Sequence, residues 1–194
     1  MGRSRNYEEI YRGLPWAYGQ KPDPELMEAV SGLARGRVVD LGGGQGRHAL
    51  ELAAAGFDVE VVDSARSGLD QLATEAADRG LDVRLTCSDL ASYVPPRQVS
   101  LVVAALIFHI PPRWLSLQIA ERVGGRLENG GLFYLSLPGY KAETAKFARE
   151  LIASAGCVER WVVKHLVTKK DRPRLPVARR NETRALGVKI AANQ

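Results

Sequence analysis

Residues 38–63, VVDLGGGQGRHALELAAAGFDVEVVD, limit the fold more than any other part of the chain. Four glycines occupy positions 42–46, interrupted only by Gln45, between a strand pattern and a helix pattern. Glycine allows a sharp turn and a close approach of backbone to a ligand, and the first turn of a helix offers unpaired N–H groups. In open α/β sheets, ligands bind at the carboxyl ends of strands. The stretch therefore predicts a ligand-binding strand–loop–helix unit.

The same alternation of strand and helix patterns continues along the chain. It predicts strands at 37–41, 58–62, 83–87, 99–105, 130–137, 158–168 and 183–191, and helices at 24–34, 47–55, 68–79, 112–123 and 142–155. Repeated strand–helix units favour right-handed crossovers. No helix separates the last two strands, so they are expected to pair antiparallel. The expected fold is a single α/β domain, a Rossmann-like doubly wound sheet of seven strands, mostly parallel with one antiparallel edge strand.

Composition excludes several classes of protein. The chain has 194 residues, 45% of them hydrophobic, and no apolar run near 20 residues, so no membrane span or membrane partner is expected. The first residues lack the apolar region of a signal peptide, which favours a cytoplasmic location. Cys87 and Cys157 are far apart in the chain and are expected to be two buried thiols rather than a disulfide. The three histidines are scattered, so no metal is expected.

The charge is unevenly distributed. Residues 160–194 contain ten Lys/Arg and two Asp/Glu, which leaves 17 and 20 for the rest of the chain. A basic segment at 169–184 could contact nucleic acid or an anionic substrate. A solvated strand and loop is the favoured interpretation, so nucleic acid is possible as a partner but not favoured.

The glycine loop itself has the pattern Asp40-x-Gly42-x-Gly44-x-Gly46. It lacks the third glycine of the dinucleotide fingerprint G-x-G-x-x-G, since Arg47 stands there. The pattern resembles motif I of the class I S-adenosylmethionine (SAM) dependent methyltransferases. The resemblance extends over roughly residues 24–170, because an acidic residue, an S-D-L tripeptide and the stretches VSLVVAALIFHI and GRLENGGLFYLSLPG stand where that family has its later motifs.

The resemblance implies SAM as cofactor, S-adenosylhomocysteine (SAH) as product and a set of cofactor-binding positions. Asp40 would orient the loop and the methionyl amino group, and Asp63, followed by Ser64, would bind the ribose hydroxyls. Arg47 either pairs with the methionine carboxylate or is solvated. The remaining cofactor positions implied are Gly42, Gly44, Gly46, Ser88, Asp89, Leu90 and Ala105. Asp89 would bind adenine, although a helix N-cap is the alternative role for it.

Before the glycine loop, LPWAYGQKPDPELMEAV resembles the lead-in of the tellurite-resistance and thiopurine type of small-molecule methyltransferase. By that resemblance, residues 1–23 form a lid segment over the pocket, and residues 24–194 form the methyltransferase domain. Tyr11, Trp16 and Tyr18 would line the acceptor pocket and exclude water. Packing on the edge of the sheet is the alternative role for these aromatic side chains.

The function implied is transfer of a methyl group from SAM to a small molecule by in-line SN2 displacement, the reaction class EC 2.1.1.-. His109, after the fourth strand, is the candidate general base, because imidazole titrates near neutrality, although a packed or capping histidine is as plausible. The family often has Asp early in this strand, where Ser100 stands, and no N-P-P-Y tetrapeptide follows it. The absence of this tetrapeptide disfavours methylation of DNA bases or glutamine.

Three other functions stay open. The enzyme could methylate RNA or protein through the basic segment, or the chain could be a SAM-binding module without catalysis. A nicotinamide-dependent oxidoreductase is disfavoured by the missing glycine. The acceptor and the oligomeric state, monomer or homodimer, are beyond the motifs.

Overall fold

The computed structural model describes residues 6–96, 98–139, 141–167 and 180–189. Its strands form one sheet in the order β3-β2-β1-β4-β5-β7-β6. The strands are β1 (Arg37–Leu41), β2 (Asp58–Asp63), β3 (Val83–Cys87), β4 (Val99–Ala105), β5 (Leu127–Pro138), β6 (Cys157–Val167) and β7 (Arg180–Lys189). Strands β1 to β5 pair parallel, whereas β7 is antiparallel to both β5 and β6. The predicted seven-stranded, mostly parallel fold is confirmed, with the antiparallel strand one place in from the edge.

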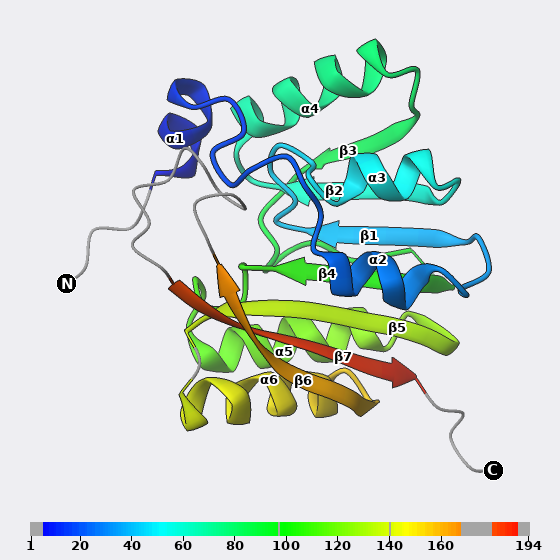
Figure 1. The fold of residues 1–194 in the computed structure, drawn as a ribbon, viewed down its shortest axis with the longest axis vertical. Helices are drawn as coiled ribbons and strands as arrows, with labels where there is room; N and C mark the ends of the chain where they lie inside the picture. The colour runs from blue at the N-terminus through cyan, green and yellow to red at the C-terminus, as the bar shows by residue number, and fades with distance from the viewer. Residues whose placement is uncertain (1–5, 97, 140, 168–179, 190–194) are drawn as a thin grey trace.

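Helices cover both faces of this sheet (Figure 1). They are α1 (Tyr7–Gly13), α2 (Pro24–Val30), α3 (Ala49–Ala54), α4 (Arg66–Asp78), α5 (Arg113–Gly124) and α6 (Ala142–Ser154). Helices α2, α3 and α4 contribute to the core on one face, and α5 and α6 to the core on the other. Helix α1 lies at the end of the sheet to which β1 and β2 point, beside α4 (Figure 1).

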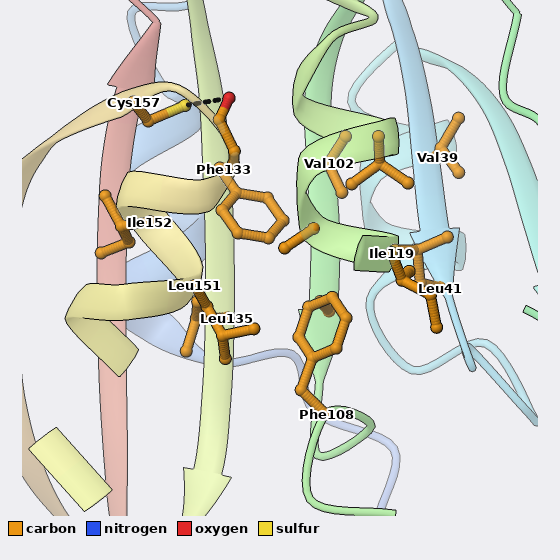
Figure 2. Packing of buried hydrophobic residues seen from close by; sticks show 14 of the residues in the cluster. Val39, Leu41, Val102, Phe108, Ile119, Phe133, Leu135, Leu151, Ile152 and Cys157 are labelled. Carbon is orange, nitrogen blue, oxygen red and sulfur yellow. Dashed lines mark hydrogen bonds between the residues drawn. The ribbon is translucent and has the colours of Figure 1, made fainter. Parts of the chain in front are cut away.

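The central strands are apolar on both faces because both faces are covered. Every residue of β4 but the last is buried. On the α5–α6 face, the rings of Phe108 and Phe133 pack edge to face, with their centroids 6.1 Å apart. They lie between Ile119 and Leu151 (Figure 2). Continuous apolar strands of this kind are typical of a doubly covered parallel sheet. The rigid sheet holds the loops at its carboxyl edge in fixed positions.

Strands β1, β3 and β4 have the predicted bounds. The predicted helices are confirmed within two residues at each end, except that α2 ends at Val30, four residues before the predicted end. Helix α1 was not predicted, because its seven residues carry little periodicity. Asn6 caps it by accepting a hydrogen bond from the Glu9 N–H at 3.4 Å. Within the described residues, no helix has the length and apolar character needed to cross a bilayer.

Two expectations from the sequence need correction or fall outside these residues. Cys157 is buried as predicted, and burial raises the pKa of its thiol to about 11, but Cys87 is exposed because β3 is an edge strand. Both thiols are free. Most of the predicted basic segment 169–184, namely residues 169–179, lies outside the described residues.

Candidate functional site

The glycine loop connects β1 to α3 at the carboxyl edge of the sheet. Gly42, Gly44 and Gly46 have φ angles of +66°, +52° and +80°, a region that residues with a β-carbon rarely adopt. A β-carbon would also lie less than 3 Å from a neighbouring side chain, namely Ile107 at Gly42, Tyr11 at Gly44 and Leu72 at Gly46. The three glycines are therefore required both by the turn and by the packing of three other segments against it.

Asp63, the last residue of β2, is tied to the glycine loop. Its carboxylate accepts hydrogen bonds from the Gly44 N–H at 2.9 Å and the Ala65 N–H at 2.8 Å. The side chain is buried, and this burial raises its pKa despite the hydrogen bonds from the backbone. A carboxylate has about four acceptor positions, so two backbone N–H groups leave capacity for two hydroxyl donors. Asp63 can thus organise the loop and bind a diol together.

Asp40, the penultimate residue of β1, is buried, and one of its carboxylate oxygens accepts no hydrogen bond from the described residues. The residue is 1% exposed, and its Oδ2 has no hydrogen-bond partner within the described ranges. Burial raises the pKa of Asp40 to about 7; Arg47 opposes this rise, whereas Asp63 and Asp23 add to it. A buried carboxylate oxygen without a donor is costly unless a donor binds it. The Asp40 side chain therefore suits a ligand that carries a cationic N–H group.

Beside Asp40 lies a buried ion cluster that was not predicted, centred on Asp23. Asp23 contacts Arg47 at 3.0 Å and Arg184 at 2.9 Å, and it accepts a hydrogen bond from the Tyr134 hydroxyl at 2.8 Å. Burial alone would raise the pKa of Asp23, but Arg47, His48 and Arg184 together hold it well below its usual range. Asp23 is therefore ionised at neutral pH.

His48 completes the contacts of Asp23. Its Nε2 lies 3.5 Å from the carboxylate, and burial, together with Arg47, lowers the pKa of His48 to about 4. The ring is therefore neutral at pH 7. Arg47 is only 11% exposed, so the solvated interpretation of this residue is wrong. Its Nη2 has no hydrogen-bond partner among the described residues, so it stays available to an anionic group such as a carboxylate.

Arg184, in β7, contacts acidic side chains in α2 and just before it. It stands in β7 opposite Ser136 of β5, and it forms ion pairs with Glu25 of α2 and, at 3.7 Å, with Glu182. Only 3% of its side chain is exposed. This arginine falls within the segment predicted as a basic contact surface, and the structure shows instead that it is an interior residue.

The segment before α2 covers the glycine loop. Glu8 binds the first turn of α4, because its carboxylate accepts from the Ser67 N–H at 3.1 Å and its carbonyl from the Ser67 hydroxyl at 2.8 Å. Tyr11 is buried against Gly44, and burial together with Asp63 raises its pKa. Tyr18 packs edge to face on Tyr11 at 6.2 Å. Two of the predicted lid aromatics therefore meet above the loop.

Trp16 faces a different part of the molecule. It packs against the core of α2, α3 and α4 and lines a surface pocket of about 230 Å³ with Pro15, Gln45 and Gln71. Its φ is +55°, which is strained for a residue with a β-carbon. The three lid aromatics predicted from the sequence are thus not brought together as one wall.

The predicted adenine tripeptide forms a tight turn after β3. Asp89 is exposed and its Oδ1 accepts from the Ala91 N–H at 2.8 Å, so it caps a turn rather than a helix. Ser88 donates to the carbonyl of Asp89, and Leu90 is buried. Ser64, after β2, is exposed. These residues lie at the carboxyl edge, beside the end of β2.

The exit from β4 borders the site from the other side. Ala105 is half-buried, and Leu106 follows it with a φ of +58°. Ile107 then packs against Gly42, and His109 is exposed. Left-handed backbone at a non-glycine residue costs energy and is common at binding sites. The exposed His109 follows this strained turn by three residues.

The structure is an α/β protein whose candidate ligand site lies at the carboxyl edge of the sheet near β1 and β4, the point where the strand order reverses. Residues 38–131 match the family described as "Methyltransferase domain". A curated relative, hemagglutinin 1 of Eikenella corrodens, is 29% identical over 106 residues, which are 55% of this chain and 35% of the relative. The chain thus spans about a third of that relative.

Solved methyltransferase structures share the whole fold. TehB from Haemophilus influenzae superposes with a TM-score of 0.72 at 16% identity, over 87% of this chain and 62% of TehB. A SAM-dependent methyltransferase from Clostridium acetobutylicum superposes with a TM-score of 0.69 at 14% identity, over 95% and 96% of the two chains. The predicted resemblance to class I SAM-dependent methyltransferases is confirmed by the match of residues 38–131 to the methyltransferase-domain family.

Proposed function

We propose that this protein binds SAM and transfers its methyl group to a small-molecule acceptor by in-line displacement. The observation that carries the proposal is the pair of buried carboxylates, Asp40 and Asp63, on adjacent parallel strands at either side of a loop of left-handed glycines. One carboxylate has an unused oxygen for an ammonium group, and the other has capacity for two hydroxyls. SAM carries both groups, an ammonium on its methionyl part and a diol on its ribose.

Different residues of the chain would bind different parts of SAM. Asp40 would bind the methionyl ammonium, Arg47 Nη2 would bind the carboxylate, and Asp63 would bind the ribose. The exposed Asp89 and the buried Leu90 would contact the adenine at the end of β3. When bound, SAM supplies a methyl group already activated on a sulfonium. What the protein must add is mainly alignment of the acceptor and exclusion of water.

A small acceptor is favoured by the position of residues 6–23, which precede α2 and are called the lead segment below. Glu8, Tyr11 and Tyr18 fix it against α4 and the glycine loop, so it covers the site where a macromolecular acceptor would need to enter. In this proposal, His109 would take a proton from an oxygen or nitrogen acceptor. A thiol acceptor would need no such base, because thiolates are accessible near neutral pH.

The first test is calorimetric titration of the full chain with SAM, SAH and NADH. We expect SAM and SAH to bind with micromolar dissociation constants and NADH not to bind. Binding of NADH in preference to SAM would contradict the proposal and support an oxidoreductase. Binding of SAM without turnover on any acceptor would support a binding module.

The pKa of Asp40 predicts how SAM affinity depends on pH. Below about pH 7, the free protein holds a proton on Asp40, and an ammonium group favours the carboxylate form. Binding must then release this proton, so affinity should rise with pH up to about 7 and level off above it. The rise is at most about tenfold per pH unit, the limit for release of one proton.

Titrations from pH 5.5 to 8 in matched buffers would measure this dependence. The control is Asp40→Asn, which keeps the shape of the side chain but cannot ionise. Its affinity should be lower at pH 8 and should not rise between pH 5.5 and 7. An unchanged pH profile in Asp40→Asn would place the ammonium group elsewhere.

A further inference from the structure

A chain of side-chain hydrogen bonds ties the glycine loop to the lead segment. The Ala17 N–H donates to Gln45 Oε1 at 2.7 Å, and Gln45 Nε2 donates to the Leu14 carbonyl at 2.8 Å. Gln45 Nε2 also donates to Gln71 Oε1 at 2.6 Å. Gln71 Nε2 then donates to the Tyr11 carbonyl at 2.6 Å. Two glutamines, one in the loop and one in α4, thereby bind the backbone of the lead segment at three places.

Gln45 is specialised for this contact. It is 7% exposed, and its oxygen and both of its N–H groups are used. It stands between Gly44 and Gly46, at the centre of the loop proposed to bind the cofactor. The amide of Gln45 therefore turns a residue of the glycine loop into an anchor for another segment.

The anchored backbone has two unusual features. Tyr11 places its hydroxyl against Gly44 and its ring against Gly68, so a shift of the segment would uncover both. Between Leu14 and Ala17, Trp16 is held in the left-handed region, and its carbonyl accepts from the Gly19 N–H at 2.9 Å. Strained backbone persists only where its surroundings fix it, and the bonds from Gln45 to both sides of Trp16 do so.

We propose that Gln45 and Gln71 are positioning residues that hold the lead segment closed over the cofactor site. Because Gln45 belongs to the glycine loop itself, ordering of the loop by a ligand would also order the segment through this amide. The inference rests on the proposed function, since it takes the glycine loop as the SAM site. It assigns to Gln45, the variable position between Gly44 and Gly46, a role in retaining the ligand.

Gln45→Glu and Gln71→Glu test this inference with nearly unchanged side-chain shape. A glutamate at position 45 cannot donate to the Leu14 carbonyl or to Gln71, and it places a carboxylate against both oxygens. A glutamate at position 71 cannot donate to the Tyr11 carbonyl. Each variant should release SAH about tenfold faster than the wild type, since one or two buried hydrogen bonds are lost.

Glu75→Gln is the matched control, because Glu75 lines the same surface pocket but takes no part in these hydrogen bonds. Dissociation rates of SAH would be measured by competition, and hydrogen exchange of residues 10–18 would be followed in the free and SAH-bound protein. Faster exchange in these residues, with that of β1 and β4 unchanged, is expected in both glutamate variants. This pattern separates a loosened segment from a general loss of stability.

Two outcomes would overturn the inference. One is release of SAH at the wild-type rate by both Gln45→Glu and Gln71→Glu. The other is wild-type exchange of residues 10–18 in both free variants. The second readout needs no cofactor, so it judges the anchor even if the wild type binds neither SAM nor SAH, a result that would instead refute the proposed function.

Discussion

Asp63→Ala is expected to weaken SAM binding roughly a hundredfold, since it removes a charged acceptor for the hydrogen bonds that two ribose hydroxyls would donate. The structure adds a second effect. Without the carboxylate, the Gly44 N–H loses its acceptor, so the loop should lose about 1–3 kcal/mol of stability. The two effects are measured separately, by calorimetric titration with SAM and by urea unfolding of the free protein.

A SAM analogue without ribose hydroxyls separates these contributions further. The wild type should bind the dideoxy analogue much more weakly than SAM, whereas Asp63→Ala should bind both alike. Asp70→Ala, which removes an exposed carboxylate of α4 away from the proposed site, is the control and should change the affinity little. If Asp63→Ala bound SAM within threefold of the wild type, or still preferred SAM to the analogue, the ribose would lie elsewhere.

The sequence predicted the sheet well because the relevant information is local. Strands β1, β3 and β4 are short apolar or alternating runs bounded by glycine, proline or charge, and their predicted bounds match. The antiparallel arrangement of β6 and β7 was predicted from the absence of a helix pattern in the sequence between the two strands. Helix α1 escaped prediction because it is held by long-range contacts, such as Glu8 with Ser67 of α4, rather than by its own periodicity.

The candidate site could be predicted only where a motif marks it. The glycines and the acids at the ends of β1 and β2 stand at fixed spacing, so their positions could be read directly. Asp23, Arg184 and Tyr134 could not, because residues from the lead-in, β7 and β5 meet only in the folded chain. For Arg184 no periodic signal was available, since residues 182–187 of β7 are all buried and the strand shows no alternation of buried and exposed positions.

Gln45 shows the same limit on a smaller scale. In the motif it is a variable position between two glycines, and nothing near it in the sequence indicates a partner. Its contacts with Leu14 and Ala17 cross about 30 residues of chain. Polar side chains that bind distant backbone leave no periodic pattern, so only the structure identifies them.

Asp23→Ala is expected to have the largest effect on stability. The substitution leaves Arg47 and Arg184 buried without their shared carboxylate, and removing one partner of a buried ion pair costs about 3–5 kcal/mol. For a chain of this size, that corresponds to a fall in Tm of about 10 °C. Urea unfolding and calorimetry of the full chain would measure both quantities.

Asp58→Ala is the matched control, because Asp58 also contacts two arginines, Arg37 and Arg84, each at 3.3 Å, but its side chain is 50% exposed. Exposed pairs contribute about 0–1 kcal/mol, so this variant should unfold almost like the wild type. The pKa of Asp23 is lower in the folded than in the unfolded protein, so its contribution is present above about pH 4 and is lost as the pH falls further. The deficit of Asp23→Ala should therefore be constant from pH 5 to 8 and shrink below pH 4. Equal stabilities of the two variants at pH 7 would mean that the buried cluster contributes no more than a surface pair.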